Sequence, residues 1–252
     1  MTSWGMLEHL SDRDLTFLAP DQAARLRADP DRLNQLLDQP ALAARLIRDP
    51  EALLHVTPYL LFSVLLRQAR RDLKDRPYTM EWTAPRSRVP VFDAGRVAGF
   101  LAEPRERDYL VELLASFTRV YSGTVWRRTR RGFRRRRFSE LDLASLQAVE
   151  AEAPEGERFY LKKRLGDAAL FLTGVYPDHV GRALPRQRSL EEIERDGATW
   201  YQGAARHALA RPAGMEDQLH YLATNFHGAR KALNFVTDRY LHPYRSNWFP
   251  AA

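Results

Sequence analysis

Four prolines fall ten residues apart near the start of the chain, at Pro20, Pro30, Pro40 and Pro50. Proline suits the first turn of a helix, is not tolerated in its interior, and disfavours helical geometry in the residue before it. Three of the prolines directly follow a polar residue that can precede a helix, namely Asp29, Gln39 and Asp49, and aspartate is a good N-cap. The spacing therefore restricts residues 11 to about 57 to a staircase of helices shorter than ten residues.

Each step of this staircase carries one apolar residue six positions beyond its proline, namely Leu26, Leu36, Leu46 and Val56. Helices this short are not stable alone and must bury their apolar face against something else. We expect residues 1–57 to form a helical cap that packs on the main core. The alternative is a platform on which these helices grip a protein partner.

The rest of the chain also predicts helices. Residues 58–72 are dense in apolar side chains and predict a buried helix. A stretch punctuated by prolines follows over residues 77–92 and reads as extended. Two further helices are expected over 94–102, capped by Asp93, and over 105–120. The last part of the chain predicts four helices, at 140–152, 156–176, 189–210 and 214–241.

Between these helical parts, residues 125–130 and 133–138 flank Arg131-Gly132 and predict a β-hairpin. After it, Ser139 to Asp142 resembles a capping box that starts the next helix. The chain is thus expected to be mainly α, with the hairpin as the only substantial β structure. Its expected parts are a helical N-terminal cap (1–57), central helices with an arginine-rich hairpin (58–138), and an antiparallel helical bundle (139–252).

The hairpin is unusually basic. It contains eight arginines within eleven residues, namely Arg127, Arg128, Arg130, Arg131, Arg134, Arg135, Arg136 and Arg137. The formal charge of the chain is +7, and it would be −1 without these eight. A cluster this dense repels itself unless solvent, acidic neighbours or a bound polyanion offsets the charge. With arginines on both faces of the hairpin, we expect it to project into solvent or onto an anion.

The most direct anion for such a segment is the phosphate backbone of DNA or RNA, which arginine binds without reading sequence. Trp126 and Phe133 are interleaved with the arginines, as is Phe138, and could stack on unpaired bases. The alternative is internal neutralisation by the acidic side chains that follow, Glu140, Asp142, Glu150 and Glu152. A protein or lipid headgroup partner is the remaining reading.

The order of elements over residues 58–138 is helix, short extended segment, helix, tight turn, helix and hairpin. This order resembles a winged helix-turn-helix DNA-binding domain. The resemblance implies that the helix beginning at Arg105 enters the major groove, and that the hairpin contacts the backbone or the minor groove as a wing.

Histidines suggest a different class of function. Glu216, His220 and His227 recur at spacings of four and seven on a predicted helix, so they share one face, and His207 can approach from the helix before. Carboxylates and histidines that face into a bundle hold metals in ferritin-like proteins. However, the Glu-x-x-His pair of that class does not occur in this chain, and histidines on helices are more often ordinary hydrogen-bonding partners.

Other signals are negative. The chain has no cysteine, which excludes disulfides, thiolate-bound metals and thiol nucleophiles. We found no nucleotide-binding glycine motif and no nucleophile elbow, so no catalytic residue and no cofactor are expected. The longest apolar run, 168–175, is too short for a membrane span, and the first residues lack the pattern of a secretory signal. We therefore expect a cytoplasmic nucleic-acid-binding accessory or regulatory protein; the sequence leaves the oligomeric state open.

Overall fold

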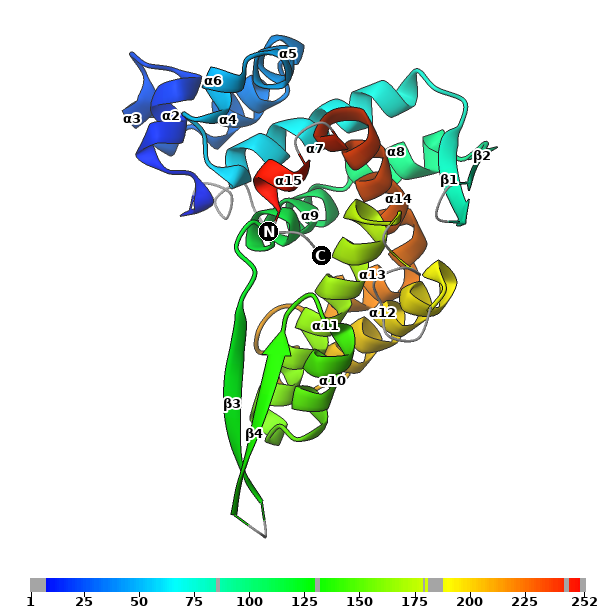
Figure 1. Cartoon of the computed structure of the whole chain (residues 1–252). Coiled ribbons are helices and arrows are strands. Elements are labelled where there is room, and N and C mark those ends of the chain that lie inside the picture. The colour runs from blue at the N-terminus through cyan, green and yellow to red at the C-terminus, as the bar shows by residue number, and fades with distance from the viewer. Residues whose placement is uncertain are drawn as a thin grey trace. The chain divides into compact units, whose positions relative to one another are not determined.

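The computed structural model describes residues 8–84, 87–129, 132–178, 180, 188–242 and 245–249. Helices dominate, and two small two-stranded sheets accompany them (Figure 1). This confirms the prediction of a mainly α protein. None of the described helices is both long and apolar enough to cross a membrane.

The chain divides into two compact units. Unit 1 contains Met1–Thr79, Pro90–Thr118 and Phe235–Trp248, and unit 2 contains Met80–Val89, Arg119–Asn234 and Phe249–Ala252. The helices expected in the central part thus fall in unit 1, whereas the arginine-rich hairpin falls in unit 2.

Unit 1 begins with the predicted staircase of short helices. They are α2 (Asp12–Leu18), α3 (Ala23–Ala28), α4 (Pro30–Leu37), α5 (Pro40–Arg48) and α6 (Pro50–Leu53). Prolines open α4, α5 and α6, and the carboxylates of Asp29 and Asp49 each accept a backbone N–H at 2.9 Å. Gln39 makes no such bond, and α3 begins three residues after Pro20 rather than at it.

The buried face of the staircase differs from the predicted one at a single step. Leu26, Leu46 and Val56 are buried as expected, but Leu36 is only partly buried. On α4 the buried side chains are instead Leu33 and Leu37, which lie four residues apart and so share one face of the helix.

Helices α4 and α5 of the staircase pack on α7 (Pro58–Lys74), the long buried helix of unit 1. The carboxylate of Asp14 on α2 is fully buried and joins the two parts. It accepts hydrogen bonds from the backbone N–H and hydroxyl of Ser11, and from the same two groups of Thr57, all at 2.8–2.9 Å. Because the Thr57 side chain also caps α7, one carboxylate fixes the starts of both helices.

The rest of unit 1 packs around α7. Helices α8 (Ala94–Ala102) and α9 (Pro104–Ser116) contact it and each other. The bounds of α8 match the prediction, whereas α9 ends four residues before the predicted Val120. The π-helix η1 (Thr237–Leu241) and the short α15 (Arg245–Trp248) complete the unit.

A second sheet was not expected. Strand β1 (Thr79–Ala84) pairs with β2 (Ser87–Val91), so the arginine-rich hairpin is not the only β structure, and that prediction was wrong. Pro90 lies within β2. A two-stranded sheet tolerates this proline because each strand keeps one edge free of ladder hydrogen bonds.

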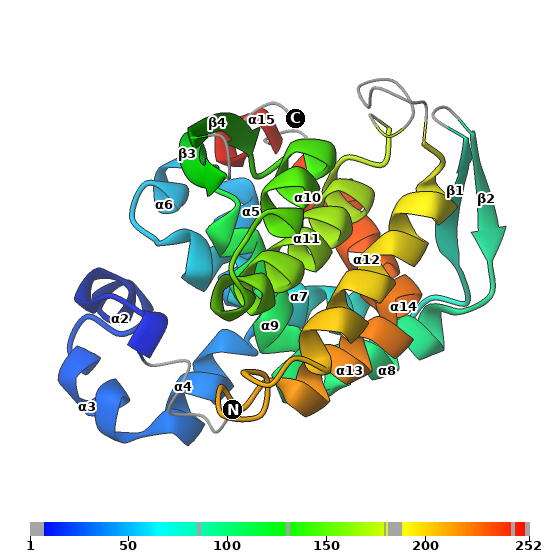
Figure 2. The ribbon, with the colours of Figure 1, turned by 90° about the horizontal axis from the view of Figure 1, so that it is seen from below.

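Unit 2 is built from most of the β1–β2 sheet, the arginine-rich hairpin and a set of helices. The hairpin consists of β3 (Ser122–Thr129) and β4 (Gly132–Ser139). The helices are α10 (Leu143–Ala151), α11 (Glu155–Val175), α12 (Leu190–Ala205), α13 (Glu216–Thr224) and α14 (Phe226–Val236), which ends in unit 1. Helix α11 packs against α10 and α12, and α12 against α13 (Figure 2). The helix predicted over 214–241 is therefore interrupted at Asn225 and ends as η1.

One start signal differs from its predicted form. Ser139 belongs to β4, so Ser139 to Asp142 is not a capping box. Asp142 alone caps α10, by accepting from the backbone N–H groups of Ala144 and Ser145 at 3.1 and 3.3 Å. Reciprocal capping boxes are found instead at the starts of α2 and α12.

Helices α11 and α12 approach each other closely at glycine. A Cβ atom added to Gly166 would lie 2.6 Å from Cδ1 of Tyr201, a fully buried ring. The Tyr201 hydroxyl donates to Asp167 at 2.8 Å, and Lys163 donates to the same carboxylate at 2.8 Å. The ring therefore fills the space above Gly166 and is held there at its far end.

Candidate nucleic-acid interface

The predicted hairpin is confirmed, and its register is defined. Strands β3 and β4 are antiparallel, and the Cα partners include Thr124 with Arg137, Trp126 with Arg135, and Val125 with Arg136. Gly132 has a φ of +117°, a backbone conformation that favours glycine. The turn residues Arg130 and Arg131 lie outside the described residues, and of the eight arginines the structure describes the side chains of Arg135, Arg136 and Arg137.

The hairpin has two different faces, because residues paired across a ladder lie on the same side. The outer face, as we call it, carries the exposed residues Thr124, Trp126, Phe133, Arg135 and Arg137. The inner face carries the partly buried residues Gly123, Val125, Arg136 and Phe138. Strand β4 packs on α10, and the hairpin extends beyond that helix (Figure 1).

The inner face is neutralised within the protein. Arg136 forms an ion pair with Glu152, which follows α10, and the Nε to Oε2 distance is 3.4 Å. The hydrogen bond to Glu152 raises the pKa of Arg136. On the same face, the ring of Phe138 lies 5.9 Å from the ring of Tyr121. For this one arginine, the predicted internal salt bridge is therefore present.

The base of the hairpin is fixed by a second acidic residue. Glu140 accepts two hydrogen bonds from the guanidinium of Arg164 on α11, at 2.8 and 3.0 Å. It also accepts the backbone N–H of Tyr121 at 3.1 Å. A bidentate pair of this kind fixes orientation. The residues just before β3 and just after β4 are therefore both held through Arg164 of α11.

The four acids that could neutralise the hairpin are thus mostly engaged elsewhere. Glu152 pairs with Arg136, but Glu140 pairs with Arg164. Asp142 caps α10, and Glu150 lies 3.9 Å from Lys162. Three of the four therefore have a partner outside the hairpin.

Arg135 and Arg137 differ from Arg136 in this respect. Both are exposed, and within the described part of the chain neither has an acidic side chain within ion-pair distance. The outer face thus carries two positive charges that no described carboxylate offsets.

Two large aromatic side chains share the outer face with these arginines. Trp126 is 63% exposed and Phe133 is 74% exposed, and neither ring contacts another ring among the residues with described positions. Trp126 is the direct cross-strand partner of Arg135. The outer face therefore combines guanidinium groups with accessible aromatic surface.

The helix that the winged-helix resemblance would place in a major groove is largely covered. Glu106, Arg107 and Asp108 at the start of α9 are buried, as are the three residues after them. Burial raises the pKa of Glu106 to about 7. The resemblance stays a prediction, and the properties of the outer face do not depend on it.

The histidines have separate partners. Nε2 of His207 lies 3.0 Å from the carbonyl of Glu155, and Nδ1 of His220 lies 3.2 Å from the Gln202 amide. His227 follows the interruption at Asn225, so it does not continue the helix of Glu216 and His220. Among the residues that can be described, no group of three or more potential ligands is placed to hold a metal ion.

Sequence reasoning missed a network of charged side chains around the buried Arg230, which the half-exposed His227 joins. Arg230 of α14 is 1% exposed and donates to Glu194 at 2.7 Å and to Glu81 of β1 at 2.6 Å. Lys231 lies 3.2 Å from Glu81, and His227 lies 3.1 Å from Glu194. Burial alone would raise the pKa of Glu194, but the hydrogen bond to His227 and the charge of Arg230 outweigh it and lower that pKa. The charges offset one another, which favours a structural role.

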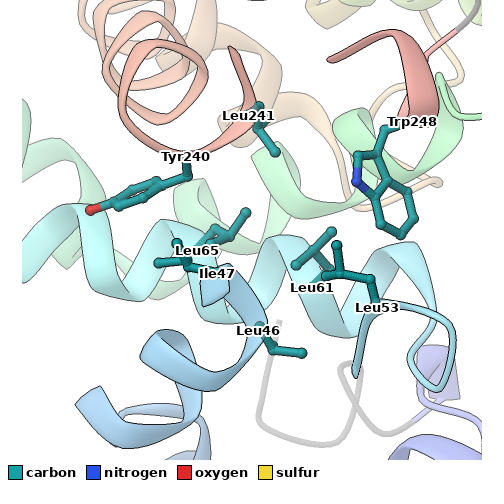
Figure 3. Close-up of a pocket in the computed structure, with 8 residues that line it drawn as sticks. All are labelled: Leu46, Ile47, Leu53, Leu61, Leu65, Tyr240, Leu241 and Trp248. Carbon is teal, nitrogen blue, oxygen red and sulfur yellow. The ribbon is translucent and has the colours of Figure 1, made fainter. Parts of the chain in front are cut away.

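Unit 1 contains an apolar pocket (Figure 3). Its lining residues are Leu46, Ile47, Leu53, Leu61, Leu65, Tyr240, Leu241 and Trp248. The cavity volume is about 20 Å³, which is room for about one water molecule. The Tyr240 hydroxyl of this lining donates to Asp72 at 2.8 Å, and the cavity volume is too small for a substrate site.

Comparison with known proteins adds no family to this description: no family model, no curated protein and no solved structure matches the chain.

Proposed function

We propose that this protein binds nucleic acid through the outer face of its β3–β4 hairpin, as an accessory or regulatory factor. The observation that carries the proposal is that neighbouring arginines differ in whether they have a carboxylate partner. Arg136 has an internal carboxylate, whereas Arg135 and Arg137 are exposed beside Trp126 without one among the described residues. Phosphate groups are the abundant polyanion that such a surface binds.

The anchoring of the hairpin supports the same function. Arg164, Glu140 and the Arg136–Glu152 pair hold the hairpin against the helices, so the outer face is presented from a fixed base. A hairpin whose backbone is already ordered loses less conformational entropy on binding than a flexible basic tail would. Contacts to phosphate alone carry no sequence information, so the proposal concerns the backbone of DNA or RNA.

A salt titration with matched variants tests the proposal. Fluorescence anisotropy would measure the affinity for labelled DNA and RNA oligonucleotides at several salt concentrations. In Arg135→Ser/Arg137→Ser the slope of log affinity against log salt should flatten. The loss of two phosphate contacts should reduce the magnitude of this slope by about 1.8 on duplex and about 1.4 on single strands.

Arg136→Ser is the matched control, because it removes the same charge from the inner face. It should leave the slope close to that of the unmodified protein and lower the thermal midpoint, since Glu152 loses its partner. If Arg136→Ser flattens the slope while the double variant does not, the outer face is not the binding surface. A folded protein that retains neither DNA nor RNA at low salt ends the proposal.

The two other candidate functions gain no specific support. The staircase uses Leu26, Leu33, Leu37 and Leu46 inside the protein, which is the behaviour of a helical cap; a protein partner at this region stays a prediction. The metal-binding bundle has no described cluster of ligands.

A further inference from the structure

We infer that the outer face selects single-stranded nucleic acid, by stacking unpaired bases on Trp126 and Phe133. This inference rests on the proposed function and names its substrate class. It starts from the exposure of the two rings, 63% and 74%, on the same face as Arg135 and Arg137. An aromatic ring beside a guanidinium fits a strand whose bases are free, because every base offers a flat apolar surface.

The register places the two rings at a useful distance. Trp126 lies opposite Arg135, and Phe133 is two residues from Arg135 on the same strand. The two aromatic residues are therefore diagonal neighbours across the ladder, and such residues lie about 7–8 Å apart. Stacked bases rise about 3.4 Å per nucleotide, so this separation matches about two stacking distances and accommodates one base between the rings.

The arginines then have a defined part. Side chains on a strand stand roughly perpendicular to the sheet, so Arg135 and Arg137 project from the same surface as the rings. They would contact the phosphates that flank the inserted base. Both the arginines and the aromatic rings would therefore contribute to affinity. The preference for unpaired strands would come from the rings.

A duplex uses this face less well. Its bases are covered by their stacked neighbours, so the rings reach them only after a base step is unstacked, which costs a few kcal/mol. The arginines would still contact duplex phosphates. The inference therefore predicts weaker binding to duplex, rather than no binding.

The test compares four ligands at one salt concentration: a single-stranded DNA, the RNA of the same sequence, the matched DNA duplex, and a single strand of equal length with abasic sites. Because the abasic strand has the same phosphates, only the stacking contribution is removed. The intact single strands should bind more tightly than the duplex and the abasic strand. Both DNA and RNA should show this dependence on bases, since the rings stack on either.

Variants of the rings give the second readout. Trp126→Leu or Phe133→Leu should weaken binding to intact single strands by about 5- to 150-fold, the range for loss of one base-aromatic stack. Neither should change binding to the abasic strand. Trp126→Phe should keep part of the affinity. Tyr160→Leu is the control, because Tyr160 is 62% exposed on α11, outside the hairpin, and it should bind as the unmodified protein does.

The outcomes separate this inference from the proposed function. If duplex, intact and abasic strands bind equally, and the leucine variants bind as the unmodified protein does, stacking is refuted. The proposed function then survives, provided that Arg135→Ser/Arg137→Ser still weakens binding. If no ligand is retained by the folded protein, both fail.

Discussion

Replacing Gly166 with alanine tests the close approach of α11 and α12. The added Cβ would lie 2.6, 2.7 and 2.9 Å from three atoms of the Tyr201 ring. Ordinary contact begins at 3.4 Å, so the ring or the helix must move by about 0.8 Å (3.4 − 2.6). The ring cannot easily move, because it is fully buried and its hydroxyl is bonded to Asp167.

The magnitude follows from two opposing effects. Overpacking of a close-packed core costs about 1–3 kcal/mol, and the buried, tethered ring favours the upper end. Alanine gains about 1 kcal/mol over glycine in a helix. We therefore expect a net loss of about 2 kcal/mol, which lowers the thermal midpoint by about 4–8 °C for a chain of this size.

Gly156→Ala on the same helix is the matched control. Nothing lies within 4 Å of a Cβ at Gly156, so this variant should be stabilised by about 0.4–1 kcal/mol. Urea unfolding followed by circular dichroism, together with thermal melts, measures both. In a Tyr201→Ala background, Gly166→Ala should no longer destabilise the protein. The close approach is refuted if Gly166→Ala is as stable as Gly156→Ala, or if its cost persists without the ring.

Two further predictions concern buried carboxylates of unit 1. Asp14→Asn should reduce the free energy of unfolding by about 2–3 kcal/mol in urea titrations, because Asp14 accepts four hydrogen bonds. The control is Asp12→Asn: the Asp12 side chain is 89% exposed, so this change should alter the free energy of unfolding by less than about 0.5 kcal/mol. Equal effects of the two changes would contradict the role of Asp14. Burial raises the pKa of Glu106 from 4.5 to about 7, so the folded state holds this proton more tightly than the unfolded state, and stability is lost as pH rises between these values. Glu106→Gln should therefore raise the thermal midpoint relative to the unmodified protein at pH 8 but not at pH 4.5, and a gain that does not depend on pH would show that ionisation of Glu106 is not its cause.

The staircase shows how far local signals predict structure. Asp29-Pro30 and Asp49-Pro50 fix the starts of two helices, because capping and proline geometry involve neighbouring residues only. The buried position on α4 was misassigned to Leu36, since the face that a short helix buries depends on how it docks on α7. The ten-residue spacing predicts where helices start, not which side they bury.

The same limit explains the errors around the hairpin. Gly132 and the β-branched and aromatic residues on either side of it predicted the hairpin, but Ser139 to Asp142 imitates a capping box at the end of a strand. Glu140, in the middle of this segment, pairs with Arg164, which is 24 residues away in sequence. No local pattern indicates this partner. The sheet β1–β2 was missed because Pro90 argues against a strand unless that strand has a free edge.

For the candidate interface, the sequence located the segment but could not rank its arginines. Alternation along β4 separates Arg136 from Arg135 and Arg137. It does not say which set packs towards α10 and meets Glu152. That distinction carries the functional proposal, and it required tertiary structure.

The shortness of α2 to α6 also affects how the protein can be made. None of these helices reaches the dozen or so residues at which an isolated helix becomes marginally stable. Helix α7, on which α4 and α5 pack, is synthesised after them. At about 5–20 residues per second, the ribosome needs roughly 1–4 s to proceed from Leu53 to Lys74. During that interval α7 does not yet cover the leucines of α4 and α5, so we expect the emerging chain to offer a binding site for chaperones until α7 is complete. Proteolysis of ribosome-bound chains of increasing length should show protection of the staircase only once α7 has emerged.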